Sequence, residues 1–319
     1  MKLQWGLLFL IFCLSQSCSI KTIAINQLAP ILSEASPRLQ KEKNWEYFRN
    51  ATPGSLQLAE VLNEAEPENL DLLALLTKGF AAYGYVVNDT EFLADKLNDE
   101  DESPYKTRAI LNLAKALQYG MTYLQAKGVT YQGILEAGRN GRASQYLTES
   151  LSKEELVDLE TAFFTGTAWL LLANLKKDDM VIVSQVPSAF ELISWVCQAR
   201  PDFQNGLCPT MQAVYFLARP PTLGGKPKKA VSLLTSAMKA NPNNLLIPVV
   251  LIEWYLIPRG DKKTYEGFKS RLNKAFDVRL NSFYVPGKPP DKTPDNLHLF
   301  NAMAEQRYLT ILKYEDDLF

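Results

Sequence analysis

The sequence predicts an all-α fold, in which antiparallel helical hairpins form one compact domain. Long stretches rich in Leu, Ala, Lys and Glu carry apolar residues at three-to-four spacing, and alternating β-branched runs are almost absent from the sequence. With 319 residues and 47% hydrophobic side chains, the chain can build one large core. Three Ala-x-Pro segments, each followed by an apolar stretch, indicate that successive helices turn back on one another.

The first 17 residues have the features of an export signal. One cation, Lys2, precedes an apolar run over residues 3–14, and this run is shorter than the roughly 20 residues that a membrane-spanning helix needs. We therefore expect residues 1–17 to be a signal peptide that is cut from the mature chain.

The residues after this run favour a lipid anchor. Ser15-Gln16-Ser17-Cys18 resembles the lipobox of bacterial lipoproteins, although Ser15 stands where Leu is usual. We expect lipidation of Cys18 and a lipidated tether over residues 18–24, which would hold the protein on a membrane in the periplasm. Ser19 favours sorting to the outer membrane of a Gram-negative cell. The alternative is cleavage by ordinary signal peptidase, which would leave Cys18 as a free thiol.

Three helices stand out along the mature chain. Residues 70–87 are apolar over most of their length, and residues 105–125 carry their apolar side chains on one face. Residues 152–176 open with Ser152 and Glu155 at the spacing of a capping box and then become apolar on all sides, so this helix should lie in the middle of the molecule. Residues 181–183 (Val-Ile-Val) have the composition of a short strand.

A weak internal repeat runs through the predicted helices. Ala-x-Pro ends three of them, at Pro67, Pro201 and Pro242, as in the junctions between tetratricopeptide-like (TPR-like) hairpins. The intervals are irregular, so a plain helical bundle is the alternative. We expect a TPR-like helical domain over residues 25–280, with a C-terminal extension over residues 281–319 packed on it.

Two cysteines are placed to pair in an oxidising compartment. Cys197 and Cys208 lie eleven residues apart, at the end of one predicted helix and the start of the next. The compartment favours a disulfide that would close a loop of about a dozen residues, and two buried reduced cysteines are the alternative.

The composition disfavours several functions. The 34 Lys and Arg balance 35 Asp and Glu, so the chain offers no basic surface for nucleic acid. His298 is the single histidine, so a hydrolase would need a cleft around it with a neighbouring acid, and a multi-histidine metal site is excluded. Gly224-Gly225-Lys226 lacks the other residues of a phosphate loop. We predict no catalytic residue, no metal and no cofactor.

Aromatic residues are abundant for a helical array. Their first interpretation is core packing, because most aromatic residues at helical spacing are buried. A curved array also has an inner face suited to small ligands, and an arginine there would bind a carboxylate. The candidates for lining such a pore or cavity are Tyr83, Arg108, Phe163, Trp169 and Trp254. For Arg108 the alternative is an exposed or capping role.

Several segments together resemble the T component (TatT) of TPR-protein-associated TRAP transporters. The resemblance runs from Cys18 to about residue 276, through CSIKTIAINQLAPILS, PENLDLLALLTKGFAAYGYVV, RAILNLAKALQYGMTYL, TAFFTGTAWLLLANL and PTLGGKPKKAVSLLTSAMKANPNNLL. Gly224 and Gly225 stand where the family has its Gly-Gly marker. Ser15 and the tail after residue 280 depart from the family pattern.

The resemblance implies a non-enzymatic periplasmic lipoprotein that forms a homotrimer with a pore through each protomer. Such a protein would bind or channel a small hydrophobic or carboxylate-bearing ligand to a periplasmic TRAP solute-binding protein, for ion-coupled uptake. The alternative function is a TPR-like envelope lipoprotein scaffold that binds other proteins through its concave face.

Overall fold

The computed structural model describes residues 20–280, 283, 285–287 and 293–319. Helices account for 81% of it, and no strand occurs among the described residues, which confirms the predicted all-α class. The predicted signal peptide and Cys18 lie outside the described residues. Helix α2 begins at Ile20, within the segment expected to be a tether.

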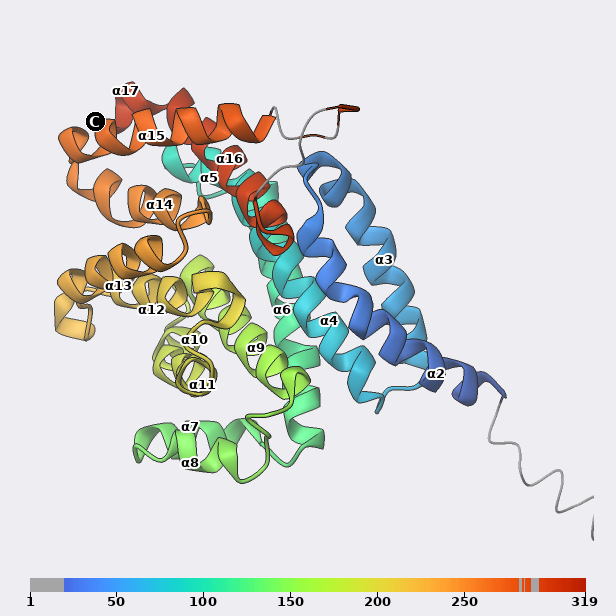
Figure 1. The fold of residues 1–319 in the computed structure, drawn as a ribbon. Helices are drawn as coiled ribbons and strands as arrows, with labels where there is room; N and C mark the ends of the chain where they lie inside the picture. Colours follow the sequence, from blue (N-terminus) through green and yellow to red (C-terminus); the bar gives the residue numbers. More distant parts are fainter. Residues whose placement is uncertain (1–19, 281–282, 284, 288–292) are drawn as a thin grey trace, which may run out of the picture.

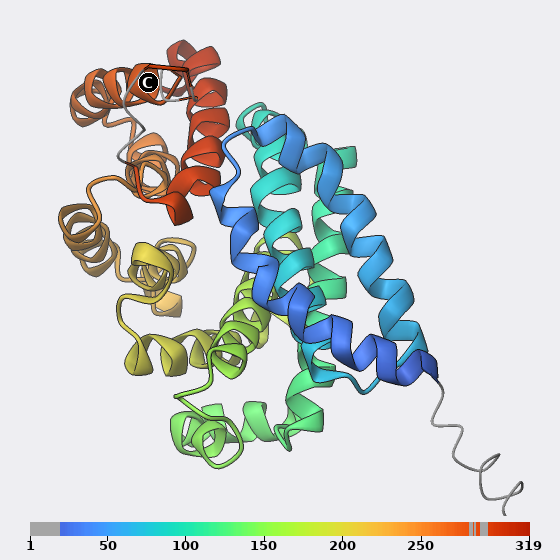
Figure 2. The same ribbon diagram turned by 45° about the vertical axis from the view of Figure 1, so that its right-hand side comes forward.

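The N-terminal helices form an upright bundle on one side of the molecule (Figures 1 and 2). They are α2 (Ile20–Ala35), α3 (Trp45–Ala65), α4 (Leu70–Ala82), α5 (Thr90–Leu97) and α6 (Pro104–Ala126). A π-helical segment, η2 (Tyr83–Asp89), continues α4 into α5. Helix α4 packs against α2, α3 and α6, so it is the centre of this bundle.

The following helices stack beside this bundle (Figure 1). They are α7 (Tyr131–Arg139), α8 (Ala143–Thr148), α9 (Leu156–Leu175), α10 (Met180–Ser184), α11 (Val186–Ala199), α12 (Leu207–Leu217), α13 (Pro227–Ala240), α14 (Leu246–Leu251), the π-helical η5 (Ile252–Leu256) and α15 (Lys262–Leu280). Short 3₁₀ turns connect several helices: η1 (Ser36–Lys41), η3 (Phe203–Gly206), η4 (Pro221–Leu223), η6 (Ile257–Arg259) and η7 (Asp295–Leu297).

Helix α9 lies at the centre of the molecule, as its apolar sequence predicts. It packs against α4, α6 and α11, and it is buried along nearly its whole length. Two helical stretches, Leu70–Leu97 and Leu156–Leu175, are long and apolar enough to cross a membrane, but 50% and 78% of their apolar windows are buried inside the protein. The ammonium of Lys78 on α4 lies 2.7 Å from the Glu160 carboxylate on α9, so an ion pair joins the two apolar helices.

The start of α9 differs from the predicted capping box. The helix begins at Leu156, and Glu155 at its N-cap makes no side-chain capping bond. The Ser152 hydroxyl instead accepts from the Glu154 backbone N–H, and Asp158 accepts from the Ser152 backbone N–H at 2.8 Å. The buried Asp158 therefore holds the preceding loop.

Residues 181–183 are helical, so the strand interpretation was wrong. They lie in α10, where the Asp179 carboxylate caps the helix by accepting from the backbone N–H groups of Val181 and Ile182. A side-chain cap on two free N–H groups outweighs the modest β propensity of three β-branched residues.

The three Ala-x-Pro segments end helices as predicted. Helices α3, α11 and α13 stop at Ala65, Ala199 and Ala240, and another helical turn begins a few residues later in each case. A TPR-like hairpin arrangement and a central pore stay predictions.

Positions 224 and 225 each require glycine, for two different physical reasons. Gly224 has φ of +90°, a conformation that only glycine adopts without strain. A Cβ added to Gly225 would lie 1.8 Å from the backbone carbonyl oxygen of Arg219, so this position has no room for a side chain.

The last long helix, α16 (His298–Lys313), joins the two parts of the molecule, and α17 (Glu315–Leu318) follows it. In Figures 1 and 2, α16 runs between the N-terminal bundle and the C-terminal helices, and it packs against α5, α14 and η1. Leu299, Met303, Tyr308 and Ile311 belong to the same hydrophobic cluster as the central helix α9. The segment after residue 280 therefore contributes to the main core.

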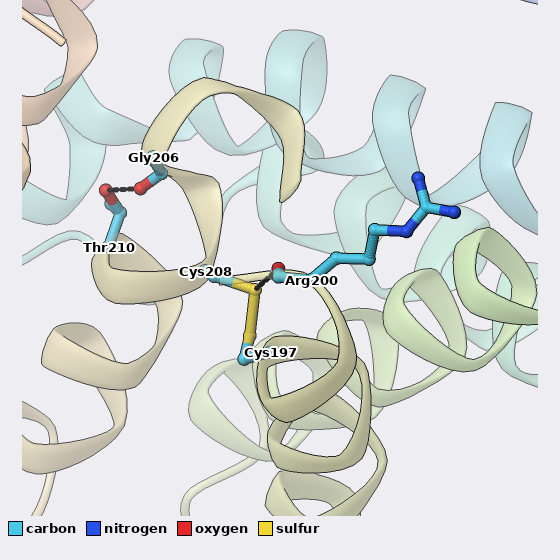
Figure 3. Close-up of a disulfide and its surroundings, with 5 residues drawn as sticks. All are labelled: Cys197, Arg200, Gly206, Cys208 and Thr210. Atoms are coloured by element: carbon cyan, nitrogen blue, oxygen red, sulfur yellow. Dashed lines mark hydrogen bonds between the residues drawn. A yellow bond between two sulfur atoms is a disulfide. The ribbon is translucent and has the colours of Figure 1, made fainter. Parts of the chain in front are cut away.

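Cys197 and Cys208 form a disulfide between the end of α11 and the start of α12 (Figure 3). The Cα atoms lie 5.6 Å apart, and the bridge closes a loop with three successive left-handed residues, Gln204, Asn205 and Gly206. The Cys208 sulfur also lies 3.8 Å from the Arg200 carbonyl oxygen.

Reduction of this disulfide is expected to lower the free energy of unfolding by about 3 kcal/mol, because the unfolded chain regains the freedom of the closed loop. Urea unfolding with and without a phosphine reductant measures the difference. The double variant Cys197→Ser/Cys208→Ser is the control and should not respond to reductant. Equal stability of the oxidised and reduced proteins would contradict the expectation.

Candidate functional site

Among the described residues, one candidate for a ligand site is an open cleft of about 690 Å³ beside α16. The start of α3, the C-terminal half of α15 and one face of α16 form its walls. Its apolar lining consists of Trp45, Phe276, Phe283, Tyr308, Leu309 and Leu312. Its polar lining consists of Lys43, Asn44, Glu46, Asn273, Asp277, Arg279, Glu305 and Gln306. Aromatic walls with a few charged groups are typical of sites for small organic ligands.

Hydrogen bonds fix the wall that α15 and α16 provide. The Tyr308 hydroxyl donates to Asn273 Oδ1 at 2.7 Å, and its ring stacks on Phe276 with 5.4 Å between the ring centres. Burial and the nearby carboxylates of Glu315 and Glu266 raise the pKa of Tyr308 to about 12. The phenol therefore stays protonated at neutral pH and remains a donor.

Two lining residues of the cleft form an ion pair. The guanidinium of Arg279 pairs with the buried Glu305 carboxylate, and its Nη1 donates to the Lys43 carbonyl oxygen at 3.1 Å. Arg279 thus ties α15 to α16 and to the residues before α3. Trp45, at the start of α3, is buried, and its indole Nε1 has no hydrogen-bond partner among the described residues.

A second polar centre lies on the other side of α16, inside the protein. Arg307 is 1% exposed, and its Nε and Nη2 donate to Glu253 Oε2 at 3.0 and 2.6 Å. Its Nη1 donates to Asp89 Oδ2 at 2.8 Å and to Thr90 Oγ1 at 3.2 Å. The two carboxylates come from the two π-helical segments, η2 and η5. Arg307 therefore links the N-terminal bundle to the C-terminal helices.

Arg307 and Glu253 stabilise each other's charged forms. Burial alone would raise the pKa of Glu253, but the positive charges of Arg307 and Lys96 outweigh it and lower this pKa to about 2. Burial would also lower the pKa of Arg307, yet Glu253 and Asp89 raise it. The Lys96 ammonium donates to Glu253 Oε1 at 3.0 Å. The charges are balanced by protein groups alone, so the centre is structural in character.

The five candidates for a pore or cavity lie in different places. Phe163 and Trp169 are buried in α9, where Phe163 contacts the rings of Phe164 and Phe203, and Trp169 contacts Tyr131. Among the described residues, none of the five belongs to the lining of the cleft. Their role in ligand binding stays a prediction.

The other three candidates lie nearer the surface. Tyr83 is half-buried in η2, where its hydroxyl donates to the Arg49 carbonyl oxygen at 3.3 Å. Trp254 is half-buried in η5, with the Lys96 ammonium 4.7 Å from its ring centre. Arg108 is exposed on α6, with its guanidinium 5.4 Å from the ring centre of Tyr105.

The single histidine does not line the cleft. His298 is buried at the start of α16, and its Nε2 lies 3.8 Å from Asp295 Oδ1. Within the described part of the chain, no group of three or more His, Cys, Asp or Glu is placed to hold a metal ion.

Comparison with known proteins places the chain in a family. A sequence model described as "TRAP transporter T-component" matches residues 41–319. The chain belongs to the TRAP transporter T-component family. The match reaches the last residue, so the tail after residue 280 is part of the family pattern and does not depart from it. An uncharacterized protein of Treponema pallidum (strain Nichols) is 22% identical over 234 residues, which are 68% of this chain and 71% of the relative.

Family membership makes this protein a transport component of the bacterial cell envelope. The cleft and the Arg307 centre both lie within the matched residues. The sequence reasoning missed both of them, because their side chains come from segments far apart in the chain. Glu253, which is the single charged residue in the apolar run over residues 245–258, was the signal that could have indicated the Arg307 centre.

Proposed function

We propose that this T component is a non-enzymatic periplasmic lipoprotein that binds a small hydrophobic or carboxylate-bearing ligand. It passes the ligand to a periplasmic TRAP solute-binding protein for ion-coupled uptake. The observation that carries the proposal is the family match over residues 41–319. Lipidation of Cys18, placement on the outer membrane and assembly as a homotrimer belong to the same proposal, and they rest on the residue pattern around Cys18 and on the family resemblance.

The cleft beside α16 supports ligand binding. Its aromatic wall would cover the apolar part of a hydrophobic or amphiphilic ligand. Its charged lining holds the acidic Glu46, Asp277 and Glu305 beside Lys43 and Arg279, so the apolar wall, and not the charge of the lining, supports the proposal. The open side of the cleft would let a ligand leave toward a bound partner.

Native mass spectrometry of the form that begins at Ser19 tests this function. We expect a gently purified trimer that retains a small molecule and gains mass when the solute-binding protein is added. An empty monomer that ignores this partner would overturn the proposal, and it would favour an envelope scaffold.

The variant Leu309→Arg is expected to lower ligand occupancy at least about tenfold, because it places a long charged side chain in the apolar wall of the cleft. Leu111→Arg is the matched control, since Leu111 is also an exposed leucine on a long helix, α6, and does not line the cleft. Ligand retained per folded protein, read by native mass spectrometry, compares the two variants. Equal loss in both would move the ligand site elsewhere.

A further inference from the structure

Helix α2 has an apolar face that the protein does not cover. Ile23, Leu28 and Ile31 are 51%, 41% and 61% exposed. At 100° per residue they span a sector about 140° wide, which also contains the exposed Ala24 and Ala35 and two exposed polar residues, Gln27 and, at the end of the helix, Glu34. This helix precedes residue 41, so it lies outside the residues that the family model matches.

The opposite face of α2 is packed. Ile25 and Ala29 are buried and form a small cluster with Leu72 of α4, against which Leu62 and Ala65 of α3 also pack. The helix is therefore held in place, and its exposed residues Ile23, Leu28 and Ile31 (the apolar strip) extend over about 12 Å of its length, given eight residues at 1.5 Å each. Lys21 and Glu34, near its two ends, are the charged residues in its sequence, and residues 22–33 carry none.

The position of this strip in the chain indicates what covers it. Ile20, the first residue of α2, is two residues from Cys18, so their Cα atoms are at most about 7 Å apart. If acyl chains on Cys18 enter the bilayer, the first turn of α2 must lie at the level of the lipid headgroups. Sixteen residues are too few to span the membrane, and the apolar residues extend along the helix.

We infer that α2 lies flat in the membrane interface, with Ile23, Leu28 and Ile31 among the lipids. This inference rests on the lipidation of Cys18 in the proposed function. The helix would orient the whole protein on the bilayer, because it is packed against α3 and α4.

Neighbouring charges limit the depth of insertion. The Asn69 side chain donates to Asn26 Oδ1 at 2.7 Å, so the corner between α3 and α4 lies beside α2. This corner carries the exposed carboxylates of Glu64 and Glu68, which must stay in water. Attraction to anionic lipids therefore contributes little, and burial of apolar surface drives the contact.

A fluorescent probe tests the position of α2 in the mature lipoprotein. Cys13 leaves with the predicted signal peptide, Cys18 would be acylated, and Cys197 and Cys208 are paired, so Ile31→Cys adds a single reactive thiol. Val278→Cys is the matched control, because Val278 is 62% exposed on a different helix, α15, whereas α2 packs against α4 and η1.

Each variant is labelled with an environment-sensitive dye and reconstituted in phosphatidylcholine vesicles with or without spin-labelled lipid. We expect at least about twofold quenching at position 31 and none at position 278, with little change when phosphatidylglycerol is added. Equal and weak quenching at both positions would overturn the inference.

Two further measurements distinguish a failure of the proposed lipid anchor from a failure of the inference about α2. The intact mass of the mature protein shows whether Cys18 is acylated. An unmodified Cys18 would overturn both the anchor in the proposed function and this inference. Thiol cross-linking between copies of the acylated Ile31→Cys variant, without lipid quenching, would assign the apolar strip to a second copy and overturn the inference alone.

Discussion

The variant Arg307→Met is expected to lower the free energy of unfolding by about 3–5 kcal/mol, because it leaves a buried carboxylate without its main partner. Glu253 is 3% exposed, and two of the three donors that its side chain accepts from belong to Arg307. Methionine matches much of the arginine volume, so the expected loss comes from charge and not from a cavity. Urea unfolding followed by circular dichroism measures it.

Two further variants test the physical reason. The double variant Arg307→Met/Glu253→Gln removes both charges and should be more stable than the single variant. Arg49→Met removes an arginine whose pair with Glu91 is partly exposed, and it should cost less than about 1 kcal/mol. A loss below about 1 kcal/mol for Arg307→Met would contradict a buried, uncompensated charge.

The pH dependence of stability has a definite sign at this centre. The pKa of Glu253 is lowered from 4.5 to about 2 in the folded protein, so its contribution is fully present above pH 4.5 and is lost as the pH falls toward 2. In Arg307→Met this pKa should rise, and the part of the acid-dependent loss that Glu253 causes should begin at higher pH.

The sequence predicted the helices that local patterns determine. The apolar face of α6 and the apolar surface of α9 follow from periodicity, and the helix ends at Ala65, Ala199 and Ala240 follow from the proline that comes two residues later. The pairing of Cys197 with Cys208 was predicted from their positions at the ends of two successive helices and from the oxidising compartment that the export signal implies. These features depend on neighbours within a few turns of the chain.

The cleft and the buried ion centre depend on distant segments, so local patterns could not predict them. Glu253 and Asp89 lie 54 and 218 residues from Arg307 in the chain. Asp89 and Arg307 resemble ordinary surface charges on their own helices. Glu253 stands alone in an apolar run, but the run does not indicate which residue pairs with it. The π-helical segments were also missed, because an extra residue in a helical turn is stabilised by the tertiary contacts of that turn and leaves no clear periodicity.

The Arg307 centre and the cleft lie on two faces of α16, which indicates how the fold positions the candidate site. Arg307 fixes α16 against η2 and α5, while Glu305 and Tyr308 present their side chains to the cleft. A shift of α16 would move one wall of the cleft, since Arg279 on α15 pairs with Glu305. The buried charges therefore stabilise the geometry in which a ligand would bind.

The variant Trp169→Ala is expected to lower the free energy of unfolding by about 3–5 kcal/mol, because it removes a large side chain from the centre of the core. Trp169 is 1% exposed, and its ring lies 5.7 Å from that of Tyr131. Trp254→Ala is the comparison. Trp254 is half-buried, so its loss of the Lys96 contact and of part of its apolar burial should cost about 1–2 kcal/mol.

Ligand binding by the same variants separates a core role for Trp169 from a pore-lining role. If the ligand binds in the cleft beside α16, the folded fraction of Trp169→Ala should retain as much ligand as the natural protein. A variant that keeps its stability but loses the ligand would instead place Trp169 on a pore wall. Urea unfolding and native mass spectrometry of one preparation read both quantities, and the packing of α9 against α4, α6 and α11 leads us to expect the first result.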